Sequence, residues 1–427
     1  RETHEVRRIK RIKTFFMVLA ICMLAWIGAV MVMLGAADVS EQPWLFLSTG
    51  AAAFALIYGM GILKQKSLSR RSKSAAGLTG VLVLILFCAS LLIPFSDTRN
   101  EPAVAEGTAY WDLETGSRIA YVHLTAMKEE GQPPVIFLHG GPGVPDMAGD
   151  SLYFGQLAQD GYDVYVYDQA GSGRSSRLDD PLQYTVERHV ADLEAIRKRI
   201  GAERIVLIGH SYGALIAAQY MAKYGAHVDK AVFISPHPLD PHDMSGGNLA
   251  NRLSPGQLSE LYKLILHPRS LMAYGLLQIN PKAARAFAGD EEMDARFDRV
   301  YAATLPALHA ENKQMPQSIY GLGFYANQTP QSRSAAPPPD PRSALKGLHV
   351  PALIIKASDD YLSWSSAMDY RQSLTESALI YFRHAGHNVY QDEPERVLAA
   401  IRSFLSGTRL SEPEYSDTVP PSDYAGS

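Results

Sequence analysis

Cysteine is almost absent from this chain, which has 427 residues and only two cysteines, Cys22 and Cys88. Both lie in apolar runs near the N-terminus, so the sequence offers neither a disulfide framework nor a cysteine-rich metal site. Metal-binding histidine patterns such as H-x-x-x-H are also missing, as are the spacings of phosphate-binding and dinucleotide-binding loops. We therefore expect no metal and no cofactor.

The chain also lacks a strong excess of charge of either sign. Its formal net charge is -4, and its basic clusters lie beside apolar stretches rather than on a separate basic face. This pattern excludes nucleic acid as an expected partner. Hydrophobic residues make up 47% of the sequence, and the length suits one membrane part followed by one globular part.

Three long runs near the N-terminus lack charged residues, at about 14–37, 44–63 and 78–95 within a membrane region at 1–96. A helix of about 20 apolar residues can cross the hydrocarbon core of a bilayer, so each run predicts a transmembrane helix. A cleaved signal peptide is the alternative for the first run. Its length and the two further runs favour a span instead.

The basic residues of the membrane region predict its orientation. They cluster in residues 1–13, before the first run, and in residues 64–73, between the second and third runs. Because lysine and arginine are enriched on the cytoplasmic side, we expect the N-terminus inside and the globular part outside the cytoplasm. The sequence thus predicts a multi-pass protein of the cell membrane, with the lipid bilayer as a partner.

Beyond a polar linker at 97–106, short apolar runs alternate with helical patterns. This alternation predicts the α/β class, with a mostly parallel sheet flanked by helices. The strands are expected at 133–138, 164–167, 205–208, 231–234, 353–355 and 378–382. They lie in a core at 107–235 and 346–408, interrupted at 236–345 by an expected helical cap, and residues 409–427 resemble a disordered tail.

The clearest chemical motif is Gly209-His210-Ser211-Tyr212-Gly213, between the strand at 205–208 and an apolar helical pattern. A G-x-S-x-G sequence at a strand-to-helix turn projects its serine above the edge of a sheet, and the glycines relieve crowding in the turn. We therefore predict Ser211 as a nucleophile. The alternative, a serine that only caps the helix, fits the bare pattern but not its position between strand and helix.

A serine nucleophile needs a base and an orienting carboxylate, which must follow it in the order acid, then histidine. Asp359 and Asp360 follow one strand, and His384 and His387 follow the next. Both loops leave the carboxyl ends of parallel strands, where side chains converge. Spacing favours Asp360 and His387, while Asp359 and His384 remain open as alternatives.

The glycine-rich segment His139-Gly140-Gly141-Pro142-Gly143 directly follows the first parallel strand. Glycines let a backbone approach a substrate closely, so the Gly141 N–H and the Tyr212 N–H are expected to form the oxyanion hole. His139 and Gly140 are candidate substrate contacts in the same loop.

Four segments together resemble the proline iminopeptidase branch of the α/β-hydrolases: HGGPG at 139–143, DQAGSGRS at 168–175, YTVERHVADLEAIRKRIG at 184–201 and GHSYG at 209–213. The resemblance covers roughly residues 107–407. It implies an α/β-hydrolase fold with an inserted cap, the triad Ser211, Asp360 and His387, and oxyanion donors at Gly141 and Tyr212. The sequence departs from the family where GHSYG replaces GGSWG, Ala170 replaces an arginine, and ASDD replaces GRYD.

Enzymes of this branch bind a free amino terminus, for which a carboxylate is a suitable partner. Asp290, Glu291, Glu292, Asp294 and Glu311 of the expected cap are candidates, although acids at a helix start also stabilise the helix dipole. We therefore expect a serine hydrolase acting on a short peptide or small molecule, as an aminopeptidase of the proline iminopeptidase type. The alternatives are a carboxylesterase and a non-catalytic membrane sensor or scaffold that retains the fold.

Overall fold

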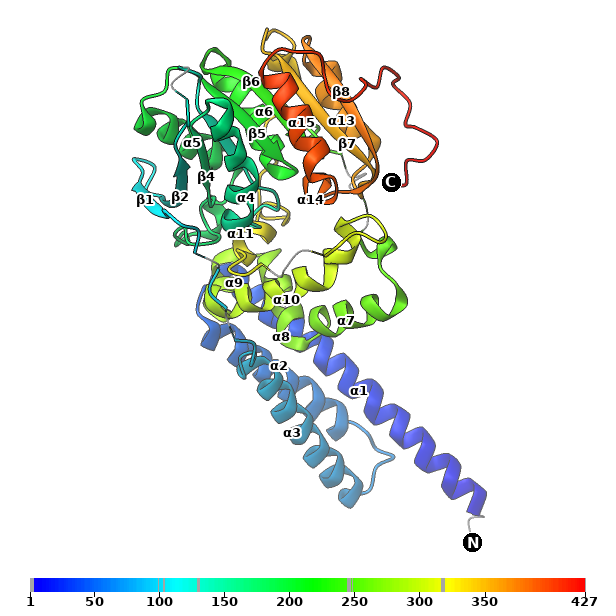
Figure 1. Ribbon diagram of the computed structural model, residues 1–427. Coiled ribbons are helices and arrows are strands. Elements are labelled where there is room, and N and C mark those ends of the chain that lie inside the picture. Colours follow the sequence, from blue (N-terminus) through cyan, green and yellow to red (C-terminus); the bar gives the residue numbers. More distant parts are fainter. Residues whose placement is uncertain are drawn as a thin grey trace. The chain divides into compact units, whose positions relative to one another are not determined.

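A sheet of eight strands forms the centre of the globular part, in the order β1-β2-β4-β3-β5-β6-β7-β8 (Figure 1). This computed structural model describes residues 4–98, 100–102, 104–128, 131–243, 247, 249–315 and 319–426. β1 pairs antiparallel with β2, β2 pairs antiparallel with β4, and the later pairings are parallel. The strands are β1 (Ala109–Asp112), β2 (Arg118–Leu124), β3 (Val135–Leu138), β4 (Val164–Tyr167), β5 (Ile205–His210), β6 (Val228–Ile234), β7 (Ala352–Asp359) and β8 (Ser377–Gly386).

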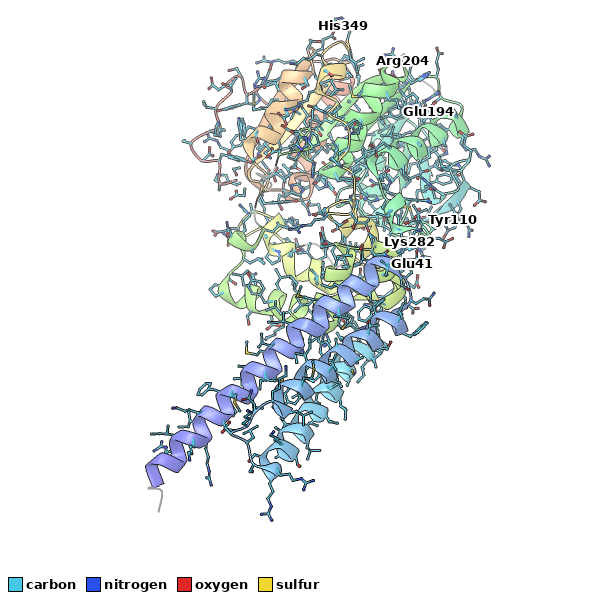
Figure 2. All side chains as sticks on the ribbon, turned by 180° about the vertical axis from the view of Figure 1, so that it is seen from behind. Glu41, Tyr110, Glu194, Arg204, Lys282 and His349 are labelled. Atoms are coloured by element: carbon cyan, nitrogen blue, oxygen red, sulfur yellow. The ribbon has the colours of Figure 1, made fainter. Side chains whose placement is uncertain are left out.

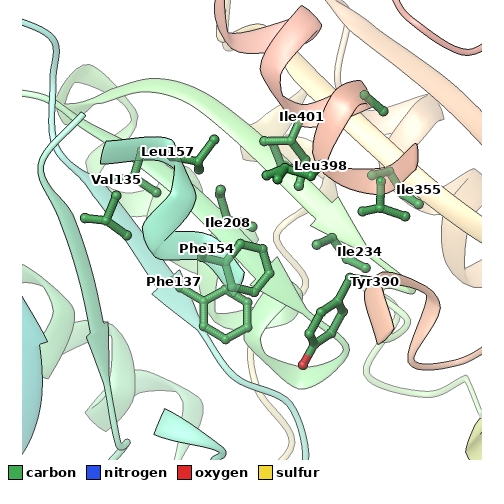
Figure 3. Packing of buried hydrophobic residues seen from close by; sticks show 14 of the residues in the cluster. Val135, Phe137, Phe154, Leu157, Ile208, Ile234, Ile355, Tyr390, Leu398 and Ile401 are labelled. Carbon is green, nitrogen blue, oxygen red and sulfur yellow. The ribbon is translucent and has the colours of Figure 1, made fainter. Parts of the chain in front are cut away.

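Helices cover both faces of this sheet, which confirms the α/β class. The flanking helices are α4 (Met147–Phe154), α5 (Val186–Ile200), α6 (Tyr212–Tyr224), α13 (Trp364–Ser373), α14 (Val389–Asp392) and α15 (Pro394–Leu405). Val232 and Ile234 face a cluster that includes Phe154 of α4 and residues of α15 (Figure 3). Phe233, between them, points to the opposite face and packs 4.7 Å from the ring of Tyr370 in α13. Strands that are apolar on both faces are typical of a buried parallel sheet.

The segment between β6 and β7 contains helices and no strand among its described residues. It contains α7 (Pro255–Ile265), α8 (Pro268–Leu277), α9 (Pro281–Phe287), α10 (Asp290–Leu308), α11 (Phe324–Gln328) and α12 (Arg342–Leu345). It does not form a single unit, however. The chain divides into a unit made of Arg1–Ser96 with Leu266–Gly289 and a unit made of Asp97–Ile265 with Asp290–Ser427. Helices α8 and α9 therefore group with the N-terminal helices, which the local sequence pattern did not indicate.

The first unit contains three long apolar helices, α1 (His4–Val39), α2 (Pro43–Leu63) and α3 (Arg70–Leu92). By length and composition each can cross a membrane. The third helix ends at Leu92, before the expected boundary at 95, because the residue preceding Pro94 disfavours helical backbone angles. The Tyr58 hydroxyl donates to the carbonyl of Ala76 at 2.8 Å, and a Cβ on Gly80 would lie 2.2 Å from the Tyr58 ring. Small residues thus allow the close contact of α2 and α3.

Residues 411–426 are ordered against the second unit, which differs from the disorder that their composition predicts. The Tyr415 amide donates to the Leu379 carbonyl of β8 at 2.7 Å. The Trp364 indole donates to the Thr418 carbonyl at 2.9 Å, and the Ala425 amide donates to the Ser358 carbonyl at 2.8 Å. A polar tail without hydrophobic periodicity can be held by backbone hydrogen bonds, which leave no signature in the sequence.

Candidate active site

The turn between β5 and α6 holds Ser211 in a strained conformation. Its φ is 52° and its ψ is −116°, a region that residues other than glycine rarely adopt. A Cβ on Gly209 would lie 2.5 Å from the Gly213 carbonyl oxygen, and a Cβ on Gly213 would lie 2.1 Å from the carbonyl oxygen of Leu138. The two glycines are therefore required by crowding, as the motif predicts.

Asp360 and His387 meet beside this turn. The Nδ1 atom of His387 lies 2.7 Å from Oδ1 of Asp360, and both side chains are buried. Asp359 instead accepts a hydrogen bond from the Ser358 hydroxyl at 2.7 Å and faces Arg252. His384 is exposed. Of the two carboxylates and two histidines left open by spacing, the structure thus brings together Asp360 and His387.

A buried lysine completes the surroundings of Asp360. Lys356 Nζ donates to Asp360 Oδ2 at 2.7 Å, and the amide of Leu362 donates to Oδ1 at 3.1 Å. Burial alone would raise the pKa of Asp360, but the charges of Lys356 and His387 outweigh it and hold the pKa well below its usual range. Sequence reasoning missed Lys356, although a lysine inside an apolar strand is itself a signal, because lysine is rarely buried without a partner.

The glycine-rich loop after β3 lies against the nucleophile. A Cβ on Gly140 would lie 3.1 Å from the Ser211 Cβ, a tight contact that a larger residue would have to relieve by a small shift. Gly141 has a φ of 115°, which favours glycine. Tyr212 begins α6, so its amide belongs to the positive end of a helix. Gly141 and Tyr212 therefore lie on the two segments from which oxyanion donors are expected.

His139 joins this loop to the segment after β4. Its Nε2 accepts from the Gln169 amide at 2.9 Å, and its Nδ1 lies 2.9 Å from the Gly140 carbonyl, to which it donates. Burial lowers the pKa of His139 to about 4, so the ring is neutral at physiological pH. Both ring nitrogens are occupied within the protein, which makes His139 a support of the loop rather than the substrate contact suggested by its position in the sequence.

Two further side chains near the catalytic candidates were not singled out by the motif. His210 Nε2 lies 3.2 Å from the His387 carbonyl, and burial lowers the pKa of His210 to about 3, so the neutral ring donates this bond. The ring centroid of Tyr361 lies 4.6 Å from that of His387, and the Tyr361 hydroxyl is hydrogen-bonded to Ser211. These contacts position the histidine loop and the serine relative to each other.

The cap is attached to the loop that carries His387. His309 Nδ1 lies 2.6 Å from Oδ1 of buried Asp392, whose Oδ2 accepts from the amide of Gly386 at 2.7 Å. The amide of Asn388 donates to the Leu308 carbonyl at 3.0 Å. Movement of the end of α10 would therefore disturb the backbone on both sides of His387.

The acidic residues of the cap differ in their surroundings. Glu291 and Glu311 are exposed and Glu292 is half-buried, so these candidates for binding an amine do not stand out by burial. Two carboxylates of α10 turn inward: Asp294, which is one of the candidates, and Asp298, which is not. Asp294 pairs with Arg177 at 2.7 Å, and Asp298 accepts from the amides of residues 321 and 322. These inward acids hold the loop before α11 and are already occupied.

Within the part of the chain that the structure describes, no group of three or more His, Cys, Asp or Glu side chains is placed to hold a metal ion. The chemistry available at the site is that of a strained serine, an imidazole, an ionised carboxylate and backbone amides.

A model of the alpha/beta hydrolase fold family matches residues 133–394. The chain belongs to the α/β-hydrolase family.

Curated relatives place this α/β-hydrolase near one branch of the family. It is 26% identical over 286 residues to a proline iminopeptidase of Saccharolobus solfataricus, covering 64% of this chain and 84% of that protein. It is also 26% identical over 294 residues to a proline iminopeptidase of Lactobacillus helveticus, covering 67% of this chain and 93% of the relative. This chain is thus similar to proline iminopeptidases, the branch that its motifs resemble.

Among solved structures, the crystal structure of a proline iminopeptidase from Mycobacterium smegmatis is similar, with a TM-score of 0.47 and 19% sequence identity. The match covers 70% of this chain and 98% of that one.

Proposed function

We propose that this α/β-hydrolase is a membrane-anchored serine aminopeptidase of the proline iminopeptidase type, with Ser211, His387 and Asp360 as its catalytic triad. The observation that carries the triad is the 2.7 Å contact between Asp360 and His387 next to a serine held at φ 52°. The peptidase activity is supported by the relatives named proline iminopeptidase, because this chain matches most of the length of each of them. Carboxylesterase activity at the same triad is the second candidate.

In the proposed mechanism His387 accepts the hydroxyl proton while Ser211 Oγ attacks the scissile carbonyl carbon. The amides of Gly141 and Tyr212 stabilise the negative charge on the tetrahedral oxygen. The imidazolium then gives its proton to the leaving amine, and the C–N bond breaks to leave an acyl-enzyme on Ser211. A water molecule, deprotonated by His387, releases the acyl group by the same steps in reverse. Asp360 stays ionised throughout and stabilises the imidazolium.

The substrate test compares free and N-acetylated aminoacyl anilides, including the proline anilide. We expect kcat/KM to fall by about 100-fold or more on acetylation, because a carboxylate that binds the substrate ammonium would lose a charge-assisted interaction. Glu291→Gln, Glu292→Gln and Glu311→Gln are assayed alongside to identify the carboxylate. Equal rates for free and blocked substrates, with turnover of p-nitrophenyl esters, would replace the peptidase proposal by the esterase one.

The orientation test uses protease added to intact cells. We propose that the N-terminus is cytoplasmic and that the hydrolase part is outside the cytoplasm. The basic segments at 1–13 and 64–73 flank the same ends of the apolar helices, and lysine and arginine are enriched on the cytoplasmic side. Residues beyond 107 are then expected to be cleaved without breaking the membrane, while an epitope at the N-terminus survives. Protection of the hydrolase part until lysis would reverse the orientation.

A further inference from the structure

The hairpin of α8 and α9 packs on the ends of the N-terminal helices, within one compact unit. The buried guanidinium of Arg269 donates to the carbonyl of Leu91, in the last turn of α3, and to the carbonyl of Phe287. Asn280 Nδ2 donates to the Ala37 carbonyl at 2.9 Å, in the last turn of α1. The last four carbonyls of a helix lack partners within it, so the hairpin satisfies two groups that lipid could not.

Apolar contacts reinforce this position. The ring of Phe287 in α9 lies 6.3 Å from that of Phe46 in α2, and the ring of His267 lies 5.0 Å from that of Phe95. Figure 2 labels Lys282 of α9 and Glu41 of the α1–α2 turn at the same end of the helices. The hairpin thus covers the end opposite to the basic segment at 64–73.

Two large apolar side chains remain exposed in the segment Leu266–Gly289, which contains this hairpin and the residues that flank it. Leu266 is 59% exposed and Leu271 is 49% exposed, although Leu276 and Leu277 of the same segment are fully buried. Ala37 ends the uncharged stretch of the first predicted span, so its contact with Asn280 marks the boundary of the hydrocarbon layer. Exposed leucines at this boundary match a bilayer surface, where apolar side chains enter the headgroup region.

We infer that the α8–α9 hairpin lies in the headgroup layer of the membrane, with Leu266 and Leu271 inserted among the lipids. This inference rests on the proposed membrane anchoring. The hairpin is continuous with the cap at both ends, because α7 ends at Ile265 and α10 begins at Asp290. Two covalent connections therefore join the cap of the hydrolase to an element bound at the bilayer surface.

Site-directed fluorescence in lipid nanodiscs tests this inference on the full chain. Cys22 and Cys88 are replaced by serine, and Leu271→Cys is labelled with an environment-sensitive fluorophore. Lipids carrying a spin label near the headgroup are expected to quench this probe at least twofold more than a probe on Leu152→Cys. Leu152 is a matched control, since it is 80% exposed on α4 of the other unit.

A probe on Met31→Cys separates this inference from the membrane anchoring. Met31 is 68% exposed on α1, within the predicted span. A probe at this position should be quenched by lipids that carry the spin label deeper in their acyl chains. Quenching at Met31 without quenching at Leu271 above the Leu152 level would overturn the hairpin inference alone. No quenching at Met31 would overturn the membrane anchoring as well.

A second inference comes from the fully buried Lys356. Its ammonium donates to Asp360 Oδ2 at 2.7 Å, to the Ser366 hydroxyl at 3.1 Å and to the Leu362 carbonyl at 3.2 Å. The ring of Tyr424, from the ordered C-terminal segment, lies 5.8 Å from Nζ. A buried lysine is costly unless its partners are well placed, and here one partner is the carboxylate that contacts His387.

We propose that Lys356 is a positioning residue of the triad, which fixes Asp360 and offsets part of its negative charge near His387. This proposal rests on the proposed triad. Without the lysine, the Asp360–His387 pair would bind its first proton more readily, because its net negative charge would be greater. Since His387 must be unprotonated to accept the serine proton, the acid limb of the kcat/KM profile should move to higher pH.

The test measures this profile for Lys356→Met and Lys356→Gln. We expect the acid limb to move upward by about 1 pH unit, with a lower kcat and little change in KM. Lys230→Met is the matched control, because Lys230 lies in the neighbouring strand β6 and bonds to the Leu405 carbonyl away from the triad. An unmoved acid limb in both Lys356 variants, or loss of folding in both, would overturn the positioning role. Full activity in Ser211→Ala would instead contradict the proposed triad itself.

Discussion

Replacement of Ser211 by alanine is expected to abolish hydrolysis, lowering kcat by about 10⁴-fold to 10⁶-fold, because the nucleophile and its base act as a unit. Alanine removes only the hydroxyl, so the turn between β5 and α6 should keep its backbone and the protein should stay folded. Hydrolysis of the best substrate from the anilide and ester panel measures the loss. Labelling by a fluorophosphonate should disappear in parallel.

Ser151→Ala is the control for this result. Ser151 is also buried, but it lies inside α4, where alanine is well tolerated. It should retain both activity and labelling. Fluorophosphonate labelling that persists in Ser211→Ala would place the nucleophile at another serine and contradict the proposed triad.

Replacement of Asp360 by asparagine is expected to lower kcat by about 10⁴-fold, because a neutral amide neither stabilises the imidazolium nor fixes the tautomer of His387. The same change leaves the buried ammonium of Lys356 without its counter-ion, which destabilises the fold. We therefore expect a lower melting temperature as well. The kinetics are to be measured at a temperature where circular dichroism reports the native signal.

Asp359→Asn is the matched control, since it changes the adjacent residue in the same way. The Asp359 carboxylate bonds to the Ser358 hydroxyl and faces Arg252 at 3.6 Å, away from His387. Its loss should change kcat by less than about threefold, because this partly exposed ion pair lies outside the reaction. Normal activity in Asp360→Asn together with loss in Asp359→Asn would assign the acid to residue 359.

Much of the globular fold follows from short patterns along the chain. The six expected parallel or central strands all occur, since runs such as 205–208 are apolar on both faces and suit only a buried sheet. The hairpin of β1 and β2 was not predicted. Its strands are short and partly exposed, and they form by pairing of β1 with β2 and of β2 with β4 rather than from local composition.

The choice within the acid pair required the tertiary structure. Asp359 and Asp360 are neighbours in the sequence, but only the second lies against His387 and Lys356. Likewise, His139 is in the glycine-rich loop that the motif indicates, yet its ring is engaged by Gln169. Spacing along the chain cannot report which way a side chain points in a loop, because loop backbones are not periodic.

The sequence by itself determined the membrane-type helices, the α/β class and the glycine-flanked turn at Ser211. Each of these depends on residues close together in the chain: an uncharged run, an alternation of short strands and helices, or glycines two positions from a serine. Only the tertiary structure decided the pairing of Lys356 with Asp360, the ordered C-terminal segment and the grouping of α8 and α9 with the N-terminal helices. These features join residues that lie far apart in the chain or whose side chains are buried for different reasons. The stability of each feature comes from hydrogen bonds and packing that form only when the elements meet.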